Sequence, residues 1–132
     1  MRDKIDRFLT WARRRPDVRA GVILGSWARS EIPADNMSDL DLLVIVSDPS
    51  VFLLETSWLL NFGEPCLTFV EPTATGNFKE RRAAFKDGKD IDFSLVPVQA
   101  IQQMVKQPIP AEIADVFRRG FKILLDKDRL AE

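Results

Sequence analysis

The sequence of 132 residues contains no histidine, no tyrosine and a single cysteine, Cys66. The absence of histidine excludes a Ser-His-Asp triad, histidine-based acid–base catalysis and every histidine-ligated metal site. A lone cysteine excludes an internal disulfide framework and a zinc site built from cysteines. Any bound metal must therefore be a hard cation held by oxygen ligands, and any general base must be a carboxylate or a lysine.

Charge of one sign and long apolar runs are also scarce. The 19 Lys and Arg residues nearly balance the 20 Asp and Glu residues, and the net charge of -1 gives no electrostatic reason to expect nucleic-acid or membrane binding. The apolar stretches LLVIV and VFLL are far too short to span a bilayer, and the first residues, MRDKIDRFLTWARRR, interleave charges with apolar residues, unlike a signal peptide. We therefore expect a cytoplasmic protein with no nucleic-acid partner and no membrane association.

The hydrophobic pattern predicts an α+β fold. Apolar residues at helical spacing predict an N-terminal helix that Pro16 ends, and the run DLDLLVIVS at 39–47 predicts a central strand with both faces covered. Asp87-Gly88 is typical of a hairpin turn between two further strands. Shorter patterns predict strands at 20–24, 66–70 and 121–125, and helices at 49–61, 98–105 and from Pro110. The expected architecture is a single domain over residues 1–132, with helices packed on a mixed sheet of about five strands.

Three features of the expected strands carry side chains suited to chemistry. Gly25 and Ser26 close the first strand. Asp39 and Asp41 lie on one face at the start of the central strand, and Asp92 lies in the second arm of the hairpin. Each feature has a plainer interpretation, as a simple turn, a solvated strand edge or a surface residue. Together, however, three carboxylates on strands otherwise built from Leu, Ile, Val and Phe would repel each other unless a cation neutralised them.

Nucleotidyl transfer with two magnesium ions is the chemistry that this arrangement suits. Magnesium prefers carboxylate and phosphate oxygens, and two ions about 3.5–4 Å apart can stabilise both the attacking and the leaving oxygen of an in-line displacement. A turn of small residues after a strand lets backbone N–H groups approach phosphates, and a serine hydroxyl adds another donor. The pattern therefore favours an enzyme that acts on a nucleoside triphosphate.

The same residues resemble a known family. The segments GSWARSEIPADNMSDLDLLVIV and DGKDIDFSLVP are similar to the nucleotidyltransferase domain of the aminoglycoside 6-adenylyltransferases, the streptomycin adenylyltransferase family of the DNA polymerase β-like superfamily. The resemblance is strongest from about Arg19 to Val98. It implies a polymerase β-like nucleotidyltransferase fold, and a magnesium-dependent enzyme that moves AMP from ATP to a hydroxyl of an acceptor.

The resemblance also implies roles for individual residues. Gly25 and Ser26 would grip the triphosphate of ATP, which is the co-substrate. Asp39 and Asp41 would ligate both Mg2+ ions. Asp92 would complete the shell of the ion that activates the acceptor hydroxyl, and it could assist the deprotonation of that hydroxyl.

Neighbouring charged residues leave alternatives open. Arg29, one helical turn beyond the Gly-Ser turn, could pair with phosphate or form a surface salt bridge. Asp90 shares a face with Asp92, but the family motif requires no acid there, so we leave Asp90 outside the site. The cations of the first hairpin arm are expected to be exposed and solvated rather than in contact with nucleotide or acceptor. They are Lys79, Arg81 and Arg82.

The identity of the acceptor is a separate question. Members of the resembled family continue into a C-terminal, mostly helical domain that contributes to the acceptor site, and this domain is absent from the sequence. The expected acceptor is an aminoglycoside. Either the sequence is part of a longer protein that includes this domain, or a second copy or a partner chain completes the acceptor pocket. Two alternatives remain: a minimal nucleotidyltransferase that modifies a protein partner, of the toxin–antitoxin type, and a non-catalytic nucleotide-binding or dimerisation module.

Overall fold

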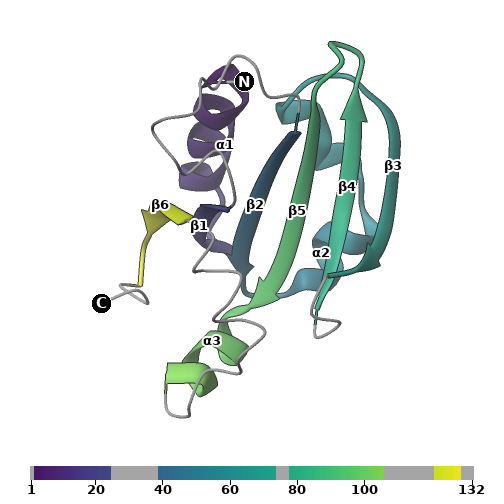
Figure 1. Ribbon diagram of the computed structural model, residues 1–132. Coiled ribbons are helices and arrows are strands. Elements are labelled where there is room, and N and C mark those ends of the chain that lie inside the picture. Colours follow the sequence, from purple (N-terminus) through teal and green to yellow (C-terminus); the bar gives the residue numbers. More distant parts are fainter. Residues whose placement is uncertain (1, 25–38, 74–77, 106–120, 129–132) are drawn as a thin grey trace.

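A computed structural model describes residues 2–24, 39–73, 78–105 and 121–128 (Figure 1). The described helices are α1 (Arg2–Arg14), α2 (Pro49–Leu54), the 3-10 helix η3 (Ser57–Asn61) and α3 (Val98–Val105). The described strands are β1 (Val18–Leu24), β2 (Asp39–Val46), β3 (Pro65–Pro72), β4 (Lys79–Phe85), β5 (Asp90–Pro97) and β6 (Phe121–Asp126). None of the helices in the described ranges is long and apolar enough to cross a membrane.

The described strands form one mixed sheet of six strands in the order β3-β4-β5-β2-β1-β6. The neighbouring pairs are antiparallel except for β2 and β5, which run parallel in the middle of the sheet. Because a parallel pair starts at one edge of the sheet, the first residues of β2 and β5 lie side by side although they are far apart in the sequence (Figure 1). This pairing positions the acidic residues described below.

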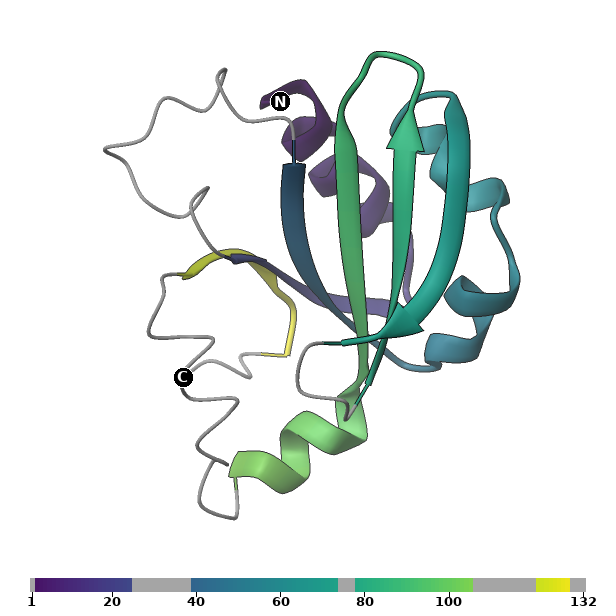
Figure 2. The same cartoon turned by 45° about the vertical axis from the view of Figure 1, so that its right-hand side comes forward.

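The helices α1, α2 and η3 cover one face of the sheet (Figure 2). Trp58 of η3 lies at the centre of the core on this face, with its ring centroid 5.4 Å from that of Trp11, 5.5 Å from Phe52 and 4.8 Å from Phe93. Alternate residues of β2 and β5 point into this core and are buried. Because side chains alternate along a strand, the intervening charged residues must point to the opposite face.

Residues 49–61, which the apolar pattern predicted as one helix, form α2 and η3 instead. Glu55 takes an extended backbone conformation, with φ -102° and ψ 147°, and so ends α2. Side chains satisfy the last carbonyls of the helix: Arg81 Nε donates to Phe52 O at 3.0 Å, and Trp58 Nε1 donates to Glu55 O at 2.8 Å. The single-helix prediction is therefore wrong, because side-chain donors, one of them from the distant Arg81, replace the hydrogen bonds that a longer helix would make.

The β4–β5 hairpin turns through residues 86–88. Phe85 N donates to Lys89 O at 3.0 Å, which closes the turn. Gly88 has a φ of 83°, in the left-handed region that glycine adopts without the penalty of a Cβ atom. The turn predicted from Asp87-Gly88 is confirmed, and its length sets which residues of β4 lie opposite each residue of β5.

A buried lysine connects this turn to α1. Lys4 is 1% exposed, and its Nζ donates to Phe62 O at 2.8 Å and pairs with Asp87 Oδ2 at 2.9 Å. The same ammonium group lies 4.5 Å from the ring centroid of Phe85. These contacts satisfy the charge of Lys4 inside the core, and the hydrogen bond from Lys4 lowers the pKa of Asp87.

Most of the predicted architecture is confirmed. The fold is α+β with a mixed sheet, and the described part of the sheet has six strands where about five were expected. The helix predicted at 98–105 has those bounds in the structure, and the predicted strands at 20–24, 39–47, 66–70 and 121–125 correspond to β1, β2, β3 and β6. The helix predicted from Pro110 lies outside the described residues.

Candidate active site

The sheet face opposite α1 and α2 carries the aspartates that the sequence pattern singled out. In the parallel β2–β5 pair, Asp41 lies opposite Asp92, and Asp39 lies opposite Asp90. The residue between the two aspartates of each strand is completely buried, at 0% exposure, in the core on the other side. The apolar residues therefore fix the orientation of both strands, and the aspartates share one face at the start of the parallel pair.

The surroundings of Asp41 on this face raise its pKa. Desolvation, a hydrogen bond with Asp92 and the negative charges of Asp92 and Asp39 raise the pKa of Asp41 to about 6, even though part of its side chain remains exposed. The positive charge of Arg82 opposes this rise. Desolvation first, and then the nearby carboxyl groups, disfavour the ionised form of Asp41, and a bound cation would relieve the repulsion between these groups.

Arg82 of β4 connects Asp92 to the neighbouring strands. It lies opposite Asp92 in the antiparallel β4–β5 pair, and its Nε donates to Asp92 Oδ1 at 2.8 Å. Its Nη1 donates to Glu71 Oε1 of β3 at 3.2 Å, and its guanidinium carbon lies 6.0 Å from the ring centroid of Phe69. The hydrogen bond to Asp92 raises the pKa of Arg82, so this cation stays charged.

A second acidic pair lies beside this ion pair. Glu80 of β4 lies opposite Glu71 of β3. Burial, a hydrogen bond with Glu71 and the charge of Asp92 raise the pKa of Glu80 to about 7. The negative charge on this face therefore extends from β2 across β5 and β4 to β3, and Arg82 lies within it.

The pair formed by Asp41 and Asp92 has the donor chemistry of a magnesium site. Magnesium is commonly held by one or two carboxylates, with water and substrate phosphate oxygens completing its octahedral shell. Within residues 2–24, 39–73, 78–105 and 121–128, no group of three or more acidic or cysteine side chains is spaced to hold a metal ion. The carboxyl groups of Asp41 and Asp92 therefore lie together, and Asp39 lies beside them on the same face. A metal site formed by all three aspartates stays a prediction.

The remaining predicted site residues, Gly25, Ser26 and Arg29, lie outside the described residues. Asp90 lies on the site face, opposite Asp39, as its place in the alternating pattern predicted. The roles of all six residues proposed for the site stay predictions.

The expectation for the cations of the first hairpin arm was wrong for two of them. Arg81 is 6% exposed and donates to the carbonyl groups of Phe52 and Leu53, which makes it a cap of α2. Arg82 is paired with Asp92 at the site rather than solvated as part of a charged arm. The alternation of β4 could have shown that adjacent arginines face opposite sides of the sheet, but not which of them faces Asp92.

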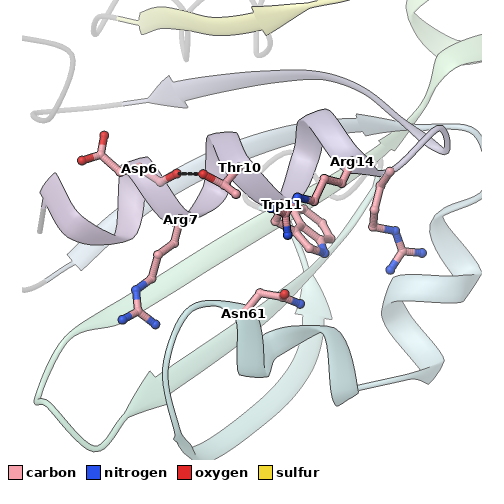
Figure 3. A pocket seen from close by; sticks show the side chains of 7 residues that line it. Asp6, Arg7, Thr10, Trp11, Arg14 and Asn61 are labelled. Carbon is pink, nitrogen blue, oxygen red and sulfur yellow. Dashed lines mark hydrogen bonds between the residues drawn. The ribbon is translucent and has the colours of Figure 1, made fainter.

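A pocket of about 450 Å³ lies elsewhere, between α1 and η3 (Figure 3). Trp11 and Asn61 line it together with three arginines of the N-terminal region. Two of these arginines, Arg7 and Arg15, already pair with aspartates at 3.2 and 2.7 Å. The pocket lies on the helical face, away from Asp41 and Asp92, so we do not include it in the site.

Known proteins are similar to this chain in fold and sequence. A crystal structure of an aminoglycoside 6-adenyltransferase from Bacillus subtilis superposes with a TM-score of 0.61 at 24% sequence identity, over 96% of this chain and 41% of that chain. The arrangement of strands and helices is therefore that of the matching part of this structure. The sequence model of the family described as streptomycin adenylyltransferase matches residues 1–132, the whole chain. The chain belongs to the streptomycin adenylyltransferase family.

Two curated relatives extend the comparison. The aminoglycoside 6-adenylyltransferase of Bacillus subtilis (strain 168) is 28% identical over 135 residues, which cover 96% of this chain and 43% of that protein. The aminoglycoside 6-adenylyltransferase of Campylobacter jejuni is 27% identical over 129 residues, which cover 93% of this chain and 41% of that protein. The chain thus spans less than half the length of the curated relatives that it matches.

Proposed function

We propose that residues 1–132 form a magnesium-dependent nucleotidyltransferase domain, which moves AMP from ATP to a hydroxyl of an aminoglycoside. The family supports ATP as the co-substrate, and the names of the relatives support the acceptor. The structural observation that carries the proposal is the register of β2 and β5, which sets Asp41 directly opposite Asp92 on the face of the sheet away from α1 and α2. Repulsion between such paired carboxylates destabilises the fold, and a cation bound to them and to the phosphates of ATP would relieve this repulsion.

Each residue has a part in this proposal. Asp41 and Asp92, with Asp39 beside them, would hold the metal, and Gly25 with Ser26 would hold the triphosphate. When bound, Mg2+ would supply positive charge to the phosphate oxygens as the bond to pyrophosphate breaks. Asp92 would accept the proton of the acceptor hydroxyl, because the chain has no histidine to do so. The buried residues around the aspartates would keep their positions fixed during transfer.

The direct test is transfer of AMP to streptomycin by the purified chain, followed by mass spectrometry of the product and by release of pyrophosphate. Asp92→Asn should reduce the rate at least about 100-fold, because it removes a metal ligand and a proton acceptor together. Asp90→Asn is the matched control, since it removes a carboxylate from the same strand and face and should retain most of the activity. Full activity of Asp92→Asn would contradict the proposed site.

The same experiment separates the alternative functions. A mass increase of one AMP on a co-purified protein, without transfer to streptomycin, would support a protein acceptor. The absence of ATP binding by calorimetry, with and without Mg2+, would support a non-catalytic module. ATP binding that is unchanged when Mg2+ is removed would contradict the metal dependence.

A further inference from the structure

Arg82 contacts two carboxylates at once, and only one of them belongs to the proposed metal site. Its Nε donates to Asp92 at 2.8 Å, while its Nη1 donates to Glu71 at the longer distance of 3.2 Å. The side chain of Arg82 is 41% exposed, that of Asp92 18% and that of Glu71 35%. The guanidinium group therefore has room to move, and it already has a second anionic partner on the far side of β4.

A divalent cation on Asp92 would compete with this ion pair. The hydrogen bond to Asp92 and a metal bond draw on the same carboxylate, and two positive charges close together repel each other strongly. Arg82 would then lose its better partner, but Glu71 and the ring of Phe69 would still hold it on the same face. An arginine with no second partner would instead have to give up its only strong contact.

We propose that Arg82 is a positioning residue that neutralises Asp92 while the site holds no metal, and that moves onto Glu71 when a divalent cation binds. This inference rests on the metal site proposed above and adds a role for a residue outside the aspartate pattern. Arg82 forms an ion pair with Asp92 before a metal ion binds. Glu71 then lowers the free-energy cost of separating Arg82 from Asp92.

The proposal predicts opposite effects for the two ends of the network on metal affinity. Arg82→Gln removes the competitor and should tighten binding of Mn2+ about fivefold. Glu71→Gln removes the alternative partner, so Arg82 stays on Asp92 and Mn2+ binding should weaken about threefold. Arg82→Lys keeps the charge but not the fork that reaches two carboxylates, so it should also tighten binding, although less.

Free Mn2+ is measured by electron paramagnetic resonance in a titration of the chain, with and without ATP, and circular dichroism checks that each variant is folded. The deciding measurement is the double variant Arg82→Gln/Glu71→Gln. If Glu71 acts through Arg82, the Glu71→Gln change has no further effect once Arg82 is absent. Asp90→Asn, the control for simple loss of negative charge, should weaken Mn2+ binding by the same factor with or without Arg82.

Three results would overturn the inference. They are weaker Mn2+ binding by Arg82→Gln, affinity of Arg82→Lys equal to that of the wild type, and an effect of Glu71→Gln that is equal in both backgrounds. In each case the wild type still binds Mn2+, so these results leave the proposed metal site intact. If the wild type binds no Mn2+ either alone or with ATP, the proposed metal site fails and this inference fails with it.

Discussion

Replacing Asp41 by Asn should make the metal-free protein more stable while it disables the proposed site. The pKa of Asp41 rises from 3.8 to about 6 through desolvation and the nearby carboxylates. At about 1.4 kcal/mol per pH unit, this rise corresponds to a cost of at most about 3 kcal/mol for the ionised form. Because the side chain is exposed, solvent screening reduces the expected gain for Asp41→Asn to about 1 kcal/mol.

The sign of the effect depends on pH. Between pH 3.8 and about 6 the folded state holds a proton on Asp41 that the unfolded state releases, so wild-type stability falls as pH rises through this window. Above it the full penalty is present, and below it both states are protonated. Asp41→Asn should therefore raise the free energy of unfolding by about 1 kcal/mol at pH 8, equivalent to about 4 °C in Tm, and by little at pH 3.5.

Urea denaturation with a metal chelator present, at pH 8 and at pH 3.5, measures this difference. Asp90→Asn serves as the control for loss of a surface carboxylate and should change stability by less than about 0.5 kcal/mol. The addition of Mg2+ and ATP should stabilise the wild type but not Asp41→Asn. A variant less stable than the wild type at pH 8, or a gain of equal size at both pH values, would refute the assigned electrostatic origin.

Two further predictions concern the fold that supports the site. Gly21→Ala should destabilise the protein by about 2 kcal/mol, because the new Cβ would lie 2.4 Å from a ring carbon of Phe8 in α1. Gly88→Ala, which meets no atom within 4 Å but needs a φ of +83°, should cost only about 1 kcal/mol; thermal denaturation that ranks the two in the reverse order would contradict the packing argument. Lys4→Met should cost about 2 kcal/mol in urea denaturation, because it leaves Phe62 O without its buried donor. Lys86→Met, at an exposed ion pair, should change stability by less than about 0.5 kcal/mol, and equal losses in the two lysine variants would show that the buried hydrogen bond is unimportant.

Local patterns predicted most elements of the described fold. The apolar spacing before Pro16 predicted α1, and the period of two along 39–47 predicted β2 and the shared face of Asp39 and Asp41. These predictions succeeded because burial on one face leaves a signal in the order of residues. The single helix at 49–61 failed because Arg81, distant in the sequence, caps the carbonyl groups at which α2 ends.

The hairpin shows where local information ends. Asp87-Gly88 predicted a turn but not its length, and the structure leaves residues 86–88 between the paired ends of β4 and β5. A turn shorter by one residue would shift the register and place Arg81, instead of Arg82, on the face of Asp92. The ion pair at the site thus depends on a difference of one residue in a turn, which composition and alternation do not specify.

The sequence alone determined the chemistry available to this protein: carboxylates on apolar strands, no histidine, and a Gly-Ser pair in a segment that resembles a nucleotidyltransferase family. The tertiary structure decided which of these groups meet. Strands β2 and β5 are not neighbours in the sequence, and only their parallel pairing sets Asp41 opposite Asp92. The physical reason is that alternation fixes the face on which a side chain lies, whereas strand order and register depend on packing across the whole sheet.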